Sequence, residues 1–188
     1  SSTTVSMADY HVEEYVREMN LAAVKLARDL ADEYTAKNPD KPRFVAGSVG
    51  PTNKTCSMSP DVNNPAYRAL SYDELAASYQ QQMEAMLEGG VDAILIETIF
   101  DTLNAKAAIF AAEQAMKATG VEVPVMLSVT VSDIGGRTLS GQTLDAFLAS
   151  VQHANIFSVG LNCSFGARQL KPFLEQLAAR APYYISAY

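Results

Sequence analysis

The sequence of 188 residues has no tryptophan, two cysteines and two histidines. Small secreted domains that depend on disulfides carry more cysteines than this, and neither Cys56 nor Cys163 belongs to a CxxC pair. The N-terminal residues also lack the basic start and the apolar stretch of a signal peptide. We therefore expect a protein of a reducing compartment, and specifically a cytoplasmic one.

Long apolar runs and basic clusters are absent as well. No segment approaches the roughly 18 apolar residues of a membrane-spanning helix. The 14 lysines and arginines are outnumbered by 21 aspartates and glutamates, which gives a net charge of −7. Because nucleic acids and anionic membranes attract basic surfaces, we expect neither as a partner. A hydrophobic content of 48% instead indicates one globular domain, with a small molecule as its ligand.

Segments with helical periodicity alternate with short apolar runs, which predicts parallel strands joined by crossover helices. The first helix is expected at about 11–36, with a buried stripe that runs from Val12 to Leu30 and includes Met19 and Leu26. Four further helices are expected at about 71–88, 102–118, 143–153 and 167–180, and five strands at about 43–49, 92–97, 124–131, 157–163 and 182–188.

Two parallel folds fit this order of elements. A doubly wound sheet of five strands would be complete at this length. A (β/α)8 barrel would not, because the strands begin roughly 35 residues apart and eight such units need about 280 residues. Length therefore favours the doubly wound sheet, whereas the placement of polar residues favours a partial barrel of about five parallel strands.

Polar residues cluster where the strands are expected to end. In both folds the functional site lies at this edge, but only in a barrel do the ends of all the strands converge. Four successive strands contribute here, which is more natural for a barrel. The residues are Ser48, Thr52, Asn53, Glu97, Thr98, Asp101, Thr130, Ser132, Asp133, Asn162, Cys163 and Ser164.

Two of these residues are candidates for chemistry. Glu97 directly follows an apolar strand, and a carboxylate there either interacts with a helix dipole or serves as a ligand or catalytic group. Cys163 ends the fourth strand and is either a buried structural cysteine or a metal ligand or nucleophile. Cys56 has no obvious partner, and neither His11 nor His153 has the spacing of a metal ligand.

Several segments together resemble a known family. They are 43–53 (RFVAGSVGPTN), 59–63 (SPDVN), 96–108 (IETIFDTLNAKAA), 136–142 (GRTLSGQ) and 160–163 (GLNC). The resemblance covers nearly the whole chain and is to the homocysteine-binding domain of cobalamin-dependent methionine synthases. The wider homocysteine S-methyltransferase family shares the motif at 160–163, which carries the chemistry.

The resemblance implies a (β/α)8 barrel that binds one zinc ion through three cysteine thiolates. The first thiolate ends a strand in the motif that matches Cys163, and the other two form an adjacent pair in a Gly-Gly-Cys-Cys motif. This sequence contains no such pair, and it also lacks the motifs of the family's first two strands. We therefore expect residues 1–188 to be a single incomplete barrel domain, equivalent to about strands three to seven.

The resemblance also implies roles for individual residues. Glu97 would hold the amino group of homocysteine, and Asn162 would stand beside the first zinc ligand and shape the site. Ser48, Gly50 and Pro51 would line its mouth. Zinc held by three thiolates with one open position would bind the homocysteine sulfur and deprotonate it. The methyl donor would be methylcobalamin on a separate module, with a folate-binding module as a further partner, and the product would be methionine.

Two alternatives stay open at this point. One is a stand-alone homocysteine methyltransferase that uses S-methylmethionine or another donor, and the other is a doubly wound, metal-free module that binds a small molecule. If the barrel is incomplete, it leaves two open strand edges and a half-exposed apolar interior. We therefore expect the isolated chain to hold no catalytic zinc, to be inactive, and to self-associate or to depend on missing parts for stability.

Overall fold

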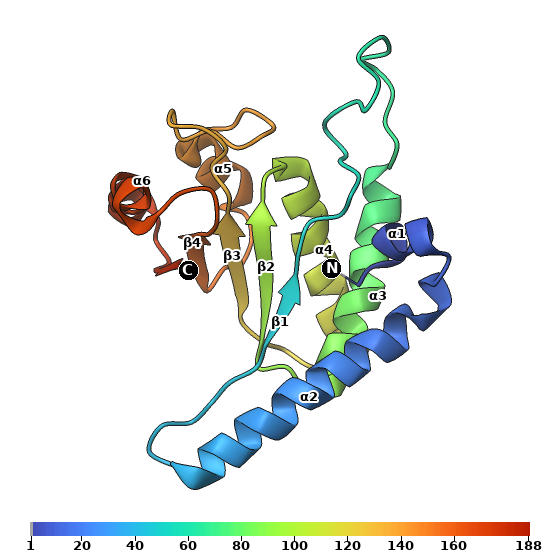
Figure 1. Ribbon diagram of the computed structural model, residues 1–188, viewed down its shortest axis with the longest axis vertical. Helices are drawn as coiled ribbons and strands as arrows, with labels where there is room; N and C mark the ends of the chain where they lie inside the picture. Colours follow the sequence, from blue (N-terminus) through green and yellow to red (C-terminus); the bar gives the residue numbers. More distant parts are fainter. Residues whose placement is uncertain (1) are drawn as a thin grey trace.

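The computed structural model describes residues 2–188 and contains one parallel sheet (Figure 1). Each strand pairs with the next strand along the chain, so the order in the sheet is β1-β2-β3-β4-β5. The strands are β1 (Ala46–Val49), β2 (Ala93–Ile99), β3 (Val125–Val129), β4 (Ser158–Leu161) and β5 (Tyr184–Ala187).

A helix connects each strand to the next. The short elements at the N-terminus are α1 (Thr4–Met7), η1 (Ala8–Tyr10) and η2 (Glu13–Tyr15), and they lead into α2 (Val16–Lys37). The helices between the strands are α3 (Tyr72–Gly89), α4 (Thr102–Thr119), α5 (Leu144–Val151) and α6 (Ala167–Arg180). No helix of the described part of the chain is long and apolar enough to cross a membrane.

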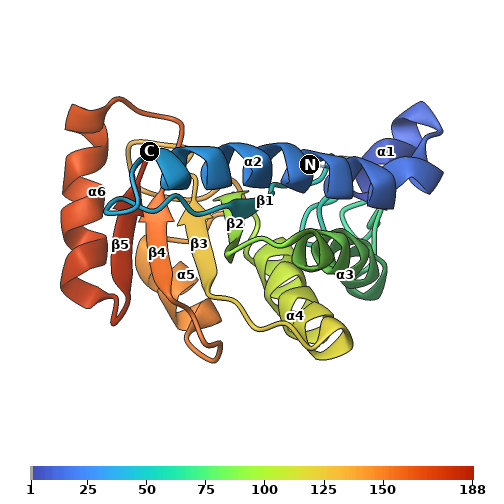
Figure 2. The ribbon, with the colours of Figure 1, turned by 90° about the horizontal axis from the view of Figure 1, so that it is seen from below.

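The sequential strand order decides between the two folds that the sequence allowed. A doubly wound sheet reverses its strand order at a switch point, with helices on both faces. Here the order never reverses, and in Figure 2 α3, α4 and α5 lie together on one side of the sheet, with α6 beside β5. Successive right-handed β-α units that all turn the same way form the wall of a barrel. The expected partial barrel of five parallel strands is therefore confirmed.

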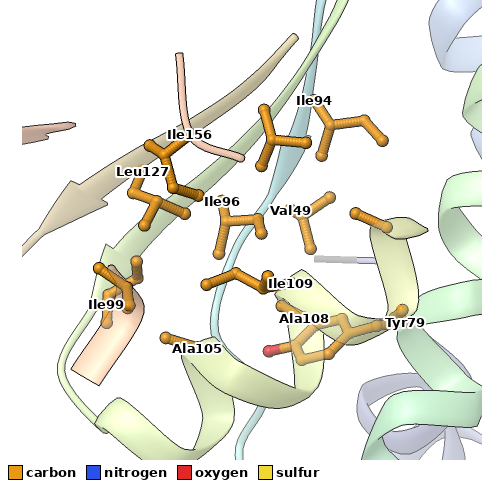
Figure 3. Close-up of a cluster of buried hydrophobic side chains, with 14 of the residues drawn as sticks. Val49, Tyr79, Ile94, Ile96, Ile99, Ala105, Ala108, Ile109, Leu127 and Ile156 are labelled. Carbon is orange, nitrogen blue, oxygen red and sulfur yellow. The ribbon is translucent and has the colours of Figure 1, made fainter. Parts of the chain in front are cut away.

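The hydrophobic core lies between the strands and the helices (Figure 3). Ile94, Ile96 and Leu127 point from the sheet toward α4, which faces them with small and branched side chains such as Ala108 and Ile109. The alanine-rich face of α4 allows it to approach both the sheet and α3 closely. Such packing fixes the strands, and therefore the positions of the residues at their ends.

The first long helix differs from expectation in its start and in its buried face. It begins at Val16, after two short 3-10 turns, rather than near residue 11. Its buried residues are Val16, Asn20, Val24 and Ala31, whereas Leu26 is 69% and Leu30 is 56% exposed. The buried face includes Asn20 because its amide donates to the carbonyl oxygens of Ser2 and Val16, so the polar group is satisfied.

The other face of the sheet is mostly small and hydroxyl-bearing rather than apolar. Ser128, Gly160 and Ser186 lie side by side on β3, β4 and β5. Gly160 is required there, because a Cβ atom at this position would lie 2.2 Å from the Ser186 Oγ atom. The expected apolar interior is thus largely absent on these strands, while Leu95 and Met126 contribute half-buried apolar side chains.

Candidate active site

Three strand ends meet at the Glu97 carboxylate. The Ser48 hydroxyl, from β1, donates a hydrogen bond to Oε1 of Glu97, and the Tyr188 hydroxyl, just beyond β5, donates to Oε2. None of the ion pairs among the described residues involves Glu97. The carboxylate therefore has two neutral donors and no cationic partner, which leaves its charge available for a positively charged ligand.

The contact between Glu97 and Tyr188 also shows that the sheet is curved. On a flat sheet β2 and β5 would lie about 14 Å apart, since neighbouring strands are separated by roughly 4.8 Å. Curvature brings the tyrosine hydroxyl to the carboxylate. Burial, followed by the hydrogen bond to Glu97, raises the pKa of Tyr188 to about 12, so its hydroxyl stays protonated as a donor at neutral pH.

The Asn162 side chain joins the ends of β2, β3 and β4, and we refer to Thr98, Ser128, Asn162 and Cys163 as the Asn162 network. Its Oδ1 accepts from the Ser128 hydroxyl at 2.7 Å and from the Thr98 backbone N–H at 3.2 Å. Its Nδ2 donates to Thr98 Oγ1 at 2.9 Å and to the Cys163 sulfur at 3.1 Å. Asn162 is only 3% exposed, and these four bonds use its full hydrogen-bonding capacity.

The backbone is unusual at both ends of this network. The pairing of β2 with β3 is irregular between Ile96 and Ile99, and within that bulge Thr98 has a φ of 56°. Left-handed backbone is rare for a β-branched residue and is found where surrounding contacts impose it. Cys163 and Ser164 both have a φ of 63°. A bulge changes the direction in which side chains leave the strand. Ile96 and Ile99 are buried on the side that faces the helices, and neither Glu97 nor Thr98, which lie between them, is buried there.

The two cysteines have different environments. Cys163 is exposed, and its sulfur accepts the hydrogen bond from Asn162. Cys56 is buried in the loop after β1, where burial and then the Asp101 charge raise the pKa of its thiol to about 11. A thiol of that pKa stays protonated and unreactive at neutral pH. This difference supports the choice of Cys163 as the candidate for chemistry.

Asp101 and Asn104, within the segment 96–108, have structural roles. Asp101 caps α4 through Oδ1, and its Oδ2 accepts from the N–H and hydroxyl groups of Ser57. The Asn104 amide accepts from the Cys56 N–H at 2.8 Å and donates to the Lys54 carbonyl at 3.1 Å. These contacts anchor the loop between β1 and α3 above the strand ends.

The segment 136–142 forms a compact turn beside the same edge. Ser140 donates to the Phe100 carbonyl oxygen through both its N–H and its hydroxyl. Gly136 has a φ of 72° and passes so close to α6 that a Cβ atom would lie 2.7 Å from the Phe173 ring. The conformation of this loop therefore depends on the glycine.

The structure connects four of the residues predicted for the site. Ser48 and Glu97 are bonded directly, and Asn162 and Cys163 are connected to Glu97 through the adjacent Thr98. Gly50 lines the same crevice as Glu97, and its carbonyl oxygen accepts a hydrogen bond from Tyr79 on α3 at 3.3 Å.

Sequence reasoning missed Tyr188 as a member of the site. The signal that could have found it is its position one residue beyond the fifth strand, which is the same rule that selected Glu97.

A zinc site of the kind implied by the resemblance needs three protein thiolates. Of the two cysteines, only Cys163 lies at this site, while the Cys56 backbone is bonded to Asn104 on α4. Among the described residues, no group of three His, Cys, Asp or Glu side chains could hold a metal ion. These residues alone therefore do not fit the zinc site.

A large cavity lies at the opposite end of the strands. We refer to it as the amino-end cavity; it has a volume of about 970 Å³ and lies between the end of α4 and the starts of β3, β4 and β5. A crevice of about 20 Å³ lies near Glu97 and is lined in part by Gly50, Pro51 and Thr98. Since functional groups cluster at the carboxyl ends of barrel strands, we assign the site by its chemistry rather than by cavity size.

Comparisons with known proteins agree with the fold. The chain superposes on the homocysteine methyltransferase MmuM from Escherichia coli in its metallated form, with a TM-score of 0.79 and 22% identity, covering 100% of this chain and 63% of MmuM. For the apo form the TM-score is 0.73 at 22% identity, with 92% and 59% covered. The chain thus spans about three fifths of the length of these structures, which show the fold alone. The family model of homocysteine S-methyltransferases matches residues 1–188, and the chain belongs to that family.

Proposed function

We propose that this chain is the homocysteine-binding part of a methyltransferase that makes methionine. The observation that carries the proposal is the Glu97 carboxylate, which has no cationic partner among the described residues and is connected through Thr98 and Asn162 to the exposed Cys163 sulfur. Homocysteine has a cationic amino group and a thiol. It can therefore place its ammonium at Glu97 and its sulfur toward Cys163.

The transfer itself is a displacement at carbon. The homocysteine sulfur, as a thiolate, forms a bond to the methyl carbon while the bond between that carbon and its donor breaks. Glu97 holds the ammonium through a charge-assisted hydrogen bond, and Ser48 and Tyr188 keep the carboxylate oxygens in place. The contribution of these residues is therefore orientation of the sulfur toward the donor.

We propose that Cys163 is one of three thiolate ligands of a zinc ion in the complete protein. The other two thiolates would come from outside residues 1–188, because the only other cysteine of the chain, Cys56, is buried and is anchored through its backbone to Asn104. The exposure of Cys163 at a strand end supports this role.

We further propose methylcobalamin as the donor, carried on a separate module of a methionine synthase that also has a folate-binding module. The likeness of segments 59–63 and 136–142 to such enzymes supports this context. Both segments lie in loops that extend beyond the carboxyl ends of the strands (Figure 1), where a donor module would approach the site.

The test uses the complete polypeptide that carries this chain. Homocysteine binding is measured by calorimetry, and methionine formation is measured with methylcobalamin or S-methylmethionine as donor. The proposal expects homocysteine binding and methyl transfer from methylcobalamin. Transfer from S-methylmethionine alone would overturn the methionine synthase context and would favour a stand-alone methyltransferase. A protein that binds no homocysteine would overturn the proposed function altogether.

A further inference from the structure

Thr98 has a backbone conformation that its residue type disfavours. It has a φ of 56° inside a bulge of β2, directly after Glu97. A strained, β-branched residue next to a site carboxylate points to a requirement of that site, because its own preference would be an extended strand.

The strain is maintained by one buried side chain. The Asn162 amide accepts from the Thr98 N–H at 3.2 Å and donates to the Thr98 hydroxyl at 2.9 Å, so it holds the backbone N–H and the side-chain hydroxyl of the same residue. The same amide accepts from the Ser128 hydroxyl at 2.7 Å, which fixes the amide orientation from the strand between them. Ser128 on β3 and Asn162 after β4 therefore hold the bulge in place.

The Asn162 side chain also contacts the sulfur of Cys163. The second N–H of the Asn162 amide donates to Cys163 Sγ at 3.1 Å, and Cys163 itself has a φ of 63°. The turn that follows is closed by a 2.8 Å hydrogen bond from the Phe165 N–H to the Cys163 carbonyl oxygen. One rigid amide therefore connects the residue after Glu97 to the sulfur of Cys163.

We infer that Thr98, acting through Asn162, fixes the separation between the Glu97 carboxylate and the Cys163 sulfur and thereby selects an amino thiol of the length of homocysteine over cysteine. This inference rests on the proposed function, because it takes the ammonium to bind at Glu97 and the thiol to bind near Cys163. Cysteine is one methylene shorter, so it should fit a fixed separation between the two groups less well. Thr98 is a positioning residue, since it acts through the amide.

The test compares affinities for homocysteine and cysteine in the complete polypeptide, measured by calorimetry under reducing conditions. The wild type should prefer homocysteine roughly 10- to 200-fold, the range that one methylene supplies. Thr98→Val removes the hydroxyl that accepts from Asn162 and should reduce the preference to about threefold or less. Thr98→Ser keeps the hydroxyl and should retain the wild-type ratio.

A matched control and a second variant complete the design. Thr119→Val removes a hydroxyl that bonds the Ala115 carbonyl at the far end of α4, and it should leave the ratio unchanged. Ser128→Ala removes one donor to the Asn162 amide and should lower the ratio of homocysteine to cysteine affinity at least about twofold. This second variant tests the inference if Thr98→Val does not fold. Folding is checked by the failure of the buried Cys56 to react with a thiol reagent.

The outcomes separate this inference from the proposed function. If the wild type binds homocysteine selectively and a folded Thr98→Val or Ser128→Ala variant keeps the full ratio, the inference is overturned while the proposed function stands. If the wild type binds both amino thiols equally, the inference is also overturned. If the wild type binds neither, the proposed function falls, and the inference falls with it.

Discussion

At the carboxyl ends of the strands, carboxylate, hydroxyl, amide and thiol groups form two adjacent hydrogen-bonded clusters, one around Glu97 and one around Asn162. At the amino ends of β3, β4 and β5, a cavity of about 970 Å³ is lined mainly by apolar and aromatic side chains, including a pair of rings, Phe157 and Tyr184, 5.1 Å apart. Cavity size and chemical content thus point to opposite ends of the same sheet.

The backbone conformation also differs between the two ends of the strands. Three of the non-glycine residues with positive φ, Thr98, Cys163 and Ser164, lie at the carboxyl ends of β2 and β4. At the amino end, by contrast, Asp92 simply pairs with Arg28 and accepts from the Val45 N–H. Backbone strain of this kind is retained at the carboxyl ends of the strands. We infer that function, and not stability alone, constrains the residues there. The following predictions test that contrast.

The largest effect is expected from Cys163→Ala in the complete protein. Loss of the exposed thiol should abolish zinc binding and methyl transfer, because one ligand of the proposed site is gone. Cys56→Ala is the matched control and should retain both. Metal content by elemental analysis and methionine formation provide the measurements. Equal zinc retention in the two variants would refute the assignment of Cys163.

Glu97→Gln should mainly weaken homocysteine binding. Replacing the carboxylate by a neutral amide removes a charge-assisted hydrogen bond worth about 1.5–3 kcal/mol, which corresponds to a loss of affinity of roughly 10- to 150-fold. Glu122→Gln changes a carboxylate of the amino-end cavity in the same way and should have no effect on binding. Unchanged affinity in Glu97→Gln, measured by calorimetry, would count against the ammonium site.

Asp101→Ala should destabilise the fold by about 2 kcal/mol, because it removes the α4 cap and the acceptor that anchors Ser57. Glu113→Ala, at the amino-end cavity on the same helix, should change the free energy of unfolding by less than about 0.5 kcal/mol. Urea denaturation measures both. Equal destabilisation would show that the two ends of α4 are anchored equally.

The smallest effect concerns pH. Burial of Asp92 opposes its ionisation, but hydrogen bonds from Val45 and Arg28 and the Arg28 charge outweigh burial and lower the pKa of Asp92. A lowered pKa in the folded state stabilises the protein above the ordinary aspartate value of about 4, and this contribution is lost as the pH falls through the lowered value. Asp92→Asn should therefore flatten the fall in melting temperature below about pH 4. An unchanged pH profile would contradict the proposed contribution.

Simple rules predicted much of the fold and part of the candidate site. Alternating helical and apolar segments were enough for five parallel strands. The rule of polar residues at strand ends selected Ser48, Glu97, Asn162 and Cys163, which the structure places at the same edge of the sheet. The buried face of α2 was predicted wrongly, since the helix has two apolar stripes and periodicity does not say which one faces α3. A buried Asn20 is tolerable only because its amide finds backbone partners.

The bulge at Thr98 could not be predicted from the sequence. Threonine favours extended strands, and local preference therefore predicts a regular β2. The left-handed backbone exists because Asn162, 64 positions further along the chain, binds the backbone N–H and the hydroxyl of Thr98. Contacts of this range depend on the assembled sheet, as does the approach of Tyr188 to Glu97.

The central claim is that homocysteine binds at the carboxyl ends of the strands, between Glu97 and Cys163. The most direct test is anomalous diffraction from crystals of the complete polypeptide with selenohomocysteine, because the selenium peak locates the ligand without assumptions. The account predicts a peak beside the Cys163 sulfur, with the ligand nitrogen within hydrogen-bond distance of Glu97. A peak in the amino-end cavity, near Phe157 and Tyr184, would contradict it.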